Sequence, residues 1–437
     1  MTVESLVAAV RFGLGPKPGE LRAGRDRAAL KADLAPQPAA PRPKGVPATG
    51  AIVAAIREAT RRGRERDVVN FLKNDAKDIL VAEVAARTRR AVETDRPFHE
   101  RLVQHWSNHF TVSLAKPIAA PLLGAFEREA ILPHVTGRFV DLLRAASLHP
   151  AMMIYLDQAT SIGPNSRAGR RRDLGLNENL AREMLELHTL GVDGGYGQDD
   201  VVQLARILTG WTVDREGAGN AGRFMSVLHE PGDKRLLGQR IAEAGPDEAE
   251  AAFRMLAAHP STARNVAARL ARHFVADDPP PATVERLARV FRDTDGDLRA
   301  VSGALVDEEA IWRQPLSKVK TPNDLVQSIF RLIRTVPEGT LMIGALKILG
   351  QQPFSAPSPK GWSDRATDWI TPDALLRRIE MAQKAAARLG RYADGAVLLD
   401  AGLGAGATAD LAAAVRRAGD RTTSVALVLA SAEFQRR

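Results

Sequence analysis

The sequence of 437 residues contains no cysteine. This absence excludes disulfide bonds, thiolate metal ligands, iron–sulfur clusters and cysteine nucleophiles. Aromatic residues are also scarce, at 5% of the chain, whereas hydrophobic residues make up 45%. A chain of this length and hydrophobicity can bury a large core, so the composition predicts a folded globular protein.

Long apolar runs are absent as well. No segment approaches the roughly 18 to 20 apolar residues that a membrane-spanning helix needs. The opening stretch, MTVESLVAAVRFGLG, has no basic segment, and Arg11 interrupts its short apolar run. The sequence therefore predicts no transmembrane segment and no signal peptide, and a cytoplasmic location by default. Nothing in it assigns an oligomeric state.

Several well-known catalytic signatures are missing too. The sequence has no P-loop, no dinucleotide-binding glycine motif, no GxSxG nucleophile motif and no kinase motif. Each of these motifs positions groups for one kind of chemistry, so their absence disfavours nucleotide and organic-cofactor reactions. We expect no cofactor, with a divalent metal ion as the one alternative.

What the chain does contain is helix-forming sequence. It is rich in alanine, leucine and arginine, which lose little rotamer freedom in a helix. We predict an all-α, multi-helix globular protein with one short β-hairpin, folded as a single integrated domain over residues 1–437. Three segments depart from the helical pattern: a proline-rich connector at 34–50, the hairpin at 223–238, and an irregular tryptophan-containing loop at 350–371. The hairpin is expected to turn at residues 230–233.

Arginine gives the chain a formal net charge of +9 and a sequence pI near 10. The arginines gather in three short runs, at residues 61–66, 87–90 and 167–172. A solvated basic surface is the simpler interpretation, and binding of a polysaccharide or another polyanion is the alternative. Nucleic acid is the least favoured partner, because these runs lack interleaved aromatics and no nucleic-acid-binding motif is visible.

A histidine pair stands out in the helix predicted over residues 98–110. His105 and His109 are one turn apart on its apolar face, which is a spacing that metal ligands use. The helix lacks the glutamate of an HExxH motif, so it supplies no catalytic base of that type. Three interpretations remain open: two buried, hydrogen-bonded histidines, a substrate-contacting or proton-shuttling histidine, or a metal site that Glu183, Glu186 or His188 completes. Asn108, on the other side of the same helix, is a candidate for substrate binding.

The densest group of ionisable residues lies in the predicted helix 176–190. Glu178, Arg182 and Glu186 are spaced i, i+4, i+8, which on an exposed helix forms an ordinary ion-pair ladder. If the stripe lines a cleft instead, two carboxylates can divide acid and base roles, as glycoside hydrolysis requires. Glu183 is the expected proton donor, because it lies at the apolar border where burial raises a carboxyl pKa. His188 belongs to the apolar side.

Other candidates lie on or beside predicted loops, where binding residues concentrate. Trp211 and Trp362 either pack in the core or form a stacking platform for sugar rings. Lys360 and Asp199 add polar groups beside them. We assign these four residues, with the histidine pair and Asn108, to substrate binding.

The order of the motifs resembles a large bacterial family known as domain of unknown function 1800. The matching pieces are RFGLGPKPGE, QHWSNHFTVS, NENLAREMLELHTLGVDGGYGQDDVVQLARILTGWTV, HEPGDKRLLGQ, VKTPNDLVQS, and PKGWSD with the following WITPDALLRR. They run in family order across essentially the whole chain. The resemblance implies relatives that are often exported and found beside a sulfatase-like partner family, from which this sequence differs in lacking a visible signal peptide.

Together these patterns predict a hydrolase that cleaves a glycosidic bond in an envelope or extracellular polysaccharide. Glu178 and Glu183 are the expected acid/base residues, with Glu186, Arg182 and His188 in support. The first alternative is a metal-dependent enzyme that uses His105, His109 and Glu183. The second alternative is a non-catalytic binding or assembly protein.

Overall fold

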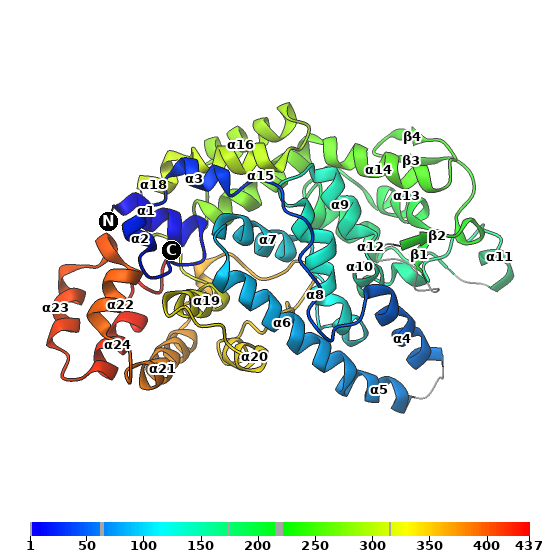
Figure 1. Ribbon diagram of the computed structural model, residues 1–437. Helices are drawn as coiled ribbons and strands as arrows, with labels where there is room; N and C mark the ends of the chain where they lie inside the picture. The colour runs from blue at the N-terminus through cyan, green and yellow to red at the C-terminus, as the bar shows by residue number, and fades with distance from the viewer. Residues whose placement is uncertain (1, 62–64, 173–174, 215–221, 314–315) are drawn as a thin grey trace.

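The fold is predominantly helical, as the sequence predicts. A computed structural model describes residues 2–437 except 62–64, 173–174, 215–221 and 314–315 (Figure 1). The α-helices that precede the strands are α1 (Val3–Val7), α2 (Glu20–Ala23), α3 (Arg27–Ala32), α4 (Thr49–Arg61), α5 (Glu65–Lys73), α6 (Asp75–Glu93), α7 (Pro97–His109), α8 (Leu123–Phe126), α9 (Phe139–Ser147), α10 (Pro150–Tyr155), α11 (Gly169–Arg172), α12 (Asn179–Glu183) and α13 (Gln198–Leu208).

Four short strands follow α13, and helices complete the chain. The strands are β1 (Trp211–Val213), β2 (Gly222–Phe224), β3 (Lys234–Leu236) and β4 (Gln239–Ile241). The later helices are α14 (Pro246–Ala258), α15 (Pro260–Phe274), α16 (Pro281–Asp293), α17 (Leu298–Val306), α18 (Glu309–Arg313), α19 (Pro322–Leu332), α20 (Gly339–Ile348), α21 (Pro372–Leu389), α22 (Gly395–Gly402), α23 (Ala409–Arg417) and α24 (Arg421–Ala430). None of the described helices has the length and hydropathy that a bilayer crossing requires.

The main hydrophobic core surrounds α7, which lies near the middle of the molecule (Figure 1). Phe98, Leu102 and Trp106 of α7 are almost completely buried, as the apolar periodicity predicts. The opposite side of α7 is covered as well: Glu100 is buried and forms an ion pair with Arg90 at 2.7 Å. A second, smaller core joins α19 to α21–α24 at the end of the molecule away from the strands (Figure 1).

The β structure differs from the predicted hairpin at 223–238. β2 pairs with β1, and β3 pairs with β4, so the described strands form two separate two-stranded antiparallel sheets. The tight turn lies at Leu237 and Gly238, which both have positive φ, as a two-residue hairpin loop requires. The segment 230–233 does not form that turn. The residues on either side of it, His229 and Lys234, make buried side-chain contacts with Glu248.

Those contacts explain the motif HEPGDK. Glu248 of α14 is fully buried. Its carboxylate oxygens lie 2.9 Å from His229 Nε2 and 2.7 Å from Lys234 Nζ. Glu230 is also buried and accepts hydrogen bonds from the backbone and the side chain of Asn165. The motif therefore joins the hairpin to α14 and to the loop before α11.

Replacing Glu248 with Gln is expected to lower the free energy of unfolding by about 3 kcal/mol, because it removes one partner of a buried ion pair. Urea-induced unfolding measures this change. Glu250→Gln on the same helix is the control: its ion pair with Arg144 is partly exposed, so a loss below about 1 kcal/mol is expected. Equal losses in the two variants would contradict the proposed role of the motif.

Candidate metal centre

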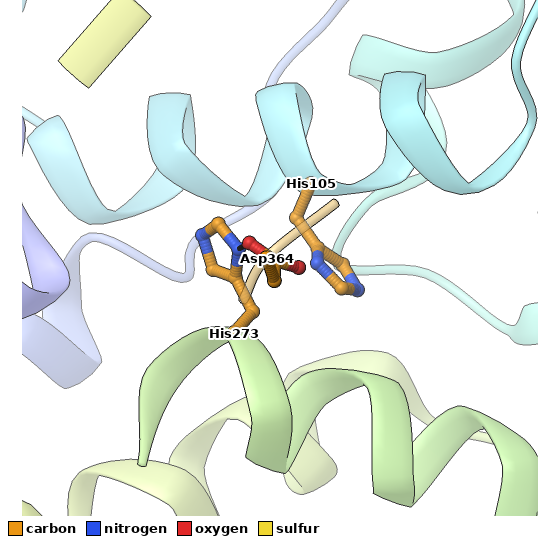
Figure 2. Close-up of side chains that lie close together, drawn as sticks. All are labelled: His105, His273 and Asp364. Carbon is orange, nitrogen blue, oxygen red and sulfur yellow. Dashed lines mark hydrogen bonds and ion pairs between the residues drawn. The ribbon is translucent and has the colours of Figure 1, made fainter. Parts of the chain in front are cut away.

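Three ionisable side chains from distant segments meet beside α7 (Figure 2). His105 comes from α7, His273 from the last turn of α15, and Asp364 from the irregular loop that follows α20. One potential ligand atom from each lies within 4.8 Å of the other two. His273 Nδ1 is 2.7 Å from Asp364 Oδ1, and the two imidazole centroids are 5.0 Å apart.

Local packing determines where each side chain lies. Phe274, next to His273, packs edge-on against Phe98 of α7, and this contact holds α15 against α7. Asn108 holds the loop by a pair of hydrogen bonds: its Nδ2 donates to the carbonyl of Trp362, and the backbone N–H of Trp362 donates to its Oδ1. Gly361 has φ +82°, and a Cβ there would lie 2.4 Å from the carbonyl oxygen of Asn108, so the close approach requires glycine.

Burial controls the protonation of the cluster. It lowers the pKa of His105 well below its ordinary value and lowers the pKa of His273 to about 4. Burial opposes ionisation of Asp364, but contact with His273 and the nearby Arg437 outweighs it and holds this carboxyl pKa well below its usual range. At neutral pH the cluster therefore contains two neutral imidazoles and one carboxylate.

Two nitrogen atoms in the cluster have unused hydrogen-bonding capacity. Neutral His273 donates its Nδ1 hydrogen to Asp364, which leaves a lone pair on Nε2. Nε2 of His273 and Nε2 of His105 are both buried and have no hydrogen-bond partner among the described residues. Buried polar atoms are almost always satisfied, so a water molecule or an ion is expected at each of these two atoms.

A buried ion-pair network supports the cluster from one side. Asp324, in the first turn of α19, receives Arg101 Nη1 at 3.0 Å and lies 3.2 Å from Arg437 Nε. Arg437 Nη2 in turn lies 3.9 Å from Asp364. Lys318 pairs with Asp277, so the charge of this lysine is balanced within the network.

Two cavities meet at the cluster. The smaller, of about 110 Å³, is lined by polar groups that include Gln104, Asn323 and Gln351. The larger, of about 840 Å³, extends between α15, the loop and the end of the π-helical turn Met184–His188. The residues that line both are His105, Asn108, Trp362, Ser363 and Asp364.

Some of the residues predicted from the sequence lie at this site. The large cavity is lined by His105, Asn108, His109, Glu186, Lys360 and Trp362. Asn108 has a role that the sequence did not predict, because its amide is used to hold the loop. Trp362 lies beside Trp369 with ring centroids 5.8 Å apart.

Other predicted residues do not line the large cavity: Glu178, Arg182, Glu183, His188, Asp199 and Trp211. Glu178 forms the ion pair with Arg182 at 2.8 Å that the i, i+4 spacing predicts. Asp199 is exposed in the first turn of α13, and Trp211 packs against Phe224. Their catalytic or binding roles stay predictions.

The alternative metal set from the sequence is corrected. Among the described residues, His105, His109 and Glu183 do not form a metal-binding group, whereas His105, His273 and Asp364 do. His109 is turned away, with Nε2 3.0 Å from the carbonyl oxygen of His188. Glu183 is half-buried near Glu186, and burial followed by the charge of Glu186 raises its pKa.

Sequence reasoning missed His273 and Asp364. His273 stands in the segment RHFVADD. Because α15 contains no second histidine, the sequence shows no metal-ligand spacing there. Asp364 ends the motif PKGWSD, in which the sequence predicts roles only for Lys360 and Trp362. The one available signal was that His273 is a histidine expected to be buried in an amphipathic helix. This signal does not show which other residues it contacts.

Comparison with known proteins identifies the family. The model of the family described as protein of unknown function (DUF1800) matches residues 7–436. The chain therefore belongs to this family. No curated protein and no solved structure matches it significantly.

Asp324 is expected to contribute strongly to stability, because removing it leaves Arg101 and Arg437 buried without their shared carboxylate. Burial disfavours its ionised form, but these two guanidinium groups overcome that effect and keep its pKa well below the usual range. Asp324→Asn should lower the free energy of unfolding by about 3 kcal/mol at neutral pH.

The lowered pKa also fixes how this loss depends on pH. The stabilisation is present above the unfolded-state pKa of about 4 and is lost as pH falls below it. The difference between wild type and Asp324→Asn in urea unfolding should therefore narrow from pH 7 to pH 3. Asp278→Asn, at an exposed ion pair with Arg365, is the control and should change stability by less than about 1 kcal/mol. A pH-independent difference would contradict the assignment.

Proposed function

We propose that this protein is a metal-dependent hydrolase that acts on a polysaccharide, with a divalent ion held by His105, His273 and Asp364. The single observation that supports this proposal most strongly is the convergence of these three side chains, with one potential ligand atom of each within 4.8 Å of the other two. All three line the smaller cavity, and His105 and Asp364 also line the larger one. Two histidines and a carboxylate leave coordination positions open for water and substrate.

The ligand states and spacing suit such an ion. Metal ligands must be deprotonated, and here the imidazoles are neutral while the carboxyl group is ionised. Bonds of roughly 2.0 to 2.2 Å place neighbouring ligand atoms about 3 to 4 Å apart, so small side-chain rotations close the present spacing. Arg437, whose Nη2 lies 3.9 Å from Asp364, places an opposing positive charge beside the cluster, and Asp324 offsets part of it.

The ion would activate a water molecule. A divalent metal lowers the pKa of bound water to near 7 and so supplies hydroxide at neutral pH. We assign a glycosidic bond as the bond that this water would cleave. The water oxygen would add to the anomeric carbon as the glycosidic C–O bond breaks, and the proton released by the water would pass to the leaving sugar oxygen, so that two hydroxyl groups form. This substrate class is supported by Trp362 on the cavity wall, since aromatic faces bind sugar rings.

Paired carboxylates are a second candidate for the same reaction. Glu183 has the raised pKa that a general acid needs, and Glu186, whose charge contributes to it, lines the large cavity. In this version Glu183 acts as the acid and Glu178, which forms an ion pair with Arg182, acts as the base, and no metal is needed.

Metal analysis tests the first candidate. Purified protein equilibrated with zinc, manganese or iron and then desalted should retain about one ion per chain by mass spectrometry. His105→Gln, His273→Gln and Asp364→Asn should each lose the ion. His134→Gln is the matched control, because this half-buried histidine does not line either cavity. Absence of a bound ion under all conditions would remove the metal from the proposal.

Activity separates the candidates. Release of reducing ends from a panel of polysaccharides should fall by roughly a hundredfold or more in His273→Gln, and chelation should produce a similar loss. A chelation-resistant activity that Glu183→Gln abolishes would favour the paired carboxylates instead. Binding to a polysaccharide without release of reducing ends or acyl groups would identify a non-catalytic binding protein.

A further inference from the structure

The large cavity has a basic wall that the hydrolytic centre does not use. Arg269 and Arg272 of α15 and Lys360 of the loop line it. Among the described residues, no carboxylate lies within 4.0 Å of Arg269, Arg272 or Lys360, which is the distance limit for an ion pair. These cations are therefore available to a ligand in the cavity.

Arg269 is the most informative of the three. Its Nη1 and Nη2 donate only to the carbonyl oxygens of Leu187 and Lys360, both at the long distance of 3.3 Å. Burial lowers its pKa, and it remains charged at neutral pH. Arg269 is half-buried and has no ion-pair partner among the described residues, so its arrangement favours binding of an anion.

The groups around Arg269 do not neutralise it. The three imidazoles whose pKa its charge helps to lower, those of His105, His109 and His188, are neutral at pH 7. Three carboxylates, Glu186, Asp364 and Asp368, also line the cavity, and the charge of Asp364 partly offsets the effect of burial on the pKa of Arg269. None of the three forms an ion pair with Arg269 or Arg272 among the described contacts. The fourth cation on the wall, Arg365, is already occupied by Asp278 at 2.7 Å.

We propose that Arg269, assisted by Arg272 and Lys360, binds an oxyanion carried by the substrate, such as a uronate carboxylate or a sulfate ester. This inference rests on the proposed function, because it makes that polysaccharide an anionic one. Arginine suits planar two-point recognition of such groups, and a cavity of about 840 Å³ has room for a sugar unit beyond the one at the metal centre.

The subsite is tested by direct binding, without any assay of hydrolysis. Inorganic sulfate and glucuronate are titrated separately into the protein, with Trp362 on the cavity wall and the adjacent Trp369 providing a fluorescence signal. Both the metal-loaded and the chelator-treated protein are used, so that an anion bound to the ion is recognised. Saturable binding that persists after chelation is expected.

Arg269→Gln should weaken that binding about tenfold or more, the scale of one charge-assisted hydrogen-bond pair. Arg269→Lys should restore part of it, which separates loss of charge from loss of folding. Arg264→Gln is the matched control, because Arg264 lies on the same helix, is exposed and pairs with Glu285 outside the cavity. Its affinity should equal that of wild type.

The two proposals fail in different ways. No saturable binding of either probe to the wild-type protein, or equal affinity in Arg269→Gln and Arg264→Gln, would overturn the subsite whatever the metal content. Anion binding that depends on Arg269 in a protein without metal or hydrolytic activity would support the subsite and remove the proposed reaction. Stronger binding of sulfate than glucuronate, or the reverse, distinguishes sulfated from uronate-containing polymers.

Discussion

The carboxylate of Asp324 links the parts of the molecule that surround the cluster. It receives Arg101 from α7 and lies against Arg437, whose guanidinium reaches toward Asp364. The same side chain belongs to the capping box of α19, since the N–H of Thr321 donates to it. One residue therefore sets the start of a helix, neutralises two buried cations and keeps Arg437 beside the candidate metal centre.

Buried arginines perform a related structural task elsewhere. Arg331 donates to the carbonyl oxygens of Gly15 and Ala91, and Arg101 donates to that of Gly13. These bonds satisfy backbone groups that irregular segments leave unpaired in the interior. Part of the high arginine content is thus internal and structural. The basic surface suggested by composition is only one of its uses.

The helical architecture was predictable because its signals are local. Apolar periodicity, proline at helix starts and capping residues such as Thr321 all act within a few residues. The burial of His105 and His109 followed from the same periodicity. The cluster itself was not predictable, since the contact of His273 with Asp364 depends on how α15 and a long loop pack against α7. The predicted strand pairing was wrong for a similar reason. The partner of β2 is β1, which lies outside the predicted hairpin.

The three residues of the candidate metal centre belong to segments that are far apart along the chain, and His273 and Asp364 alone are separated by 91 positions. No local unit of the fold can assemble the site by itself. An ion that binds all three must therefore be released whenever any one segment detaches, which couples occupancy to the cooperative unfolding of the whole core.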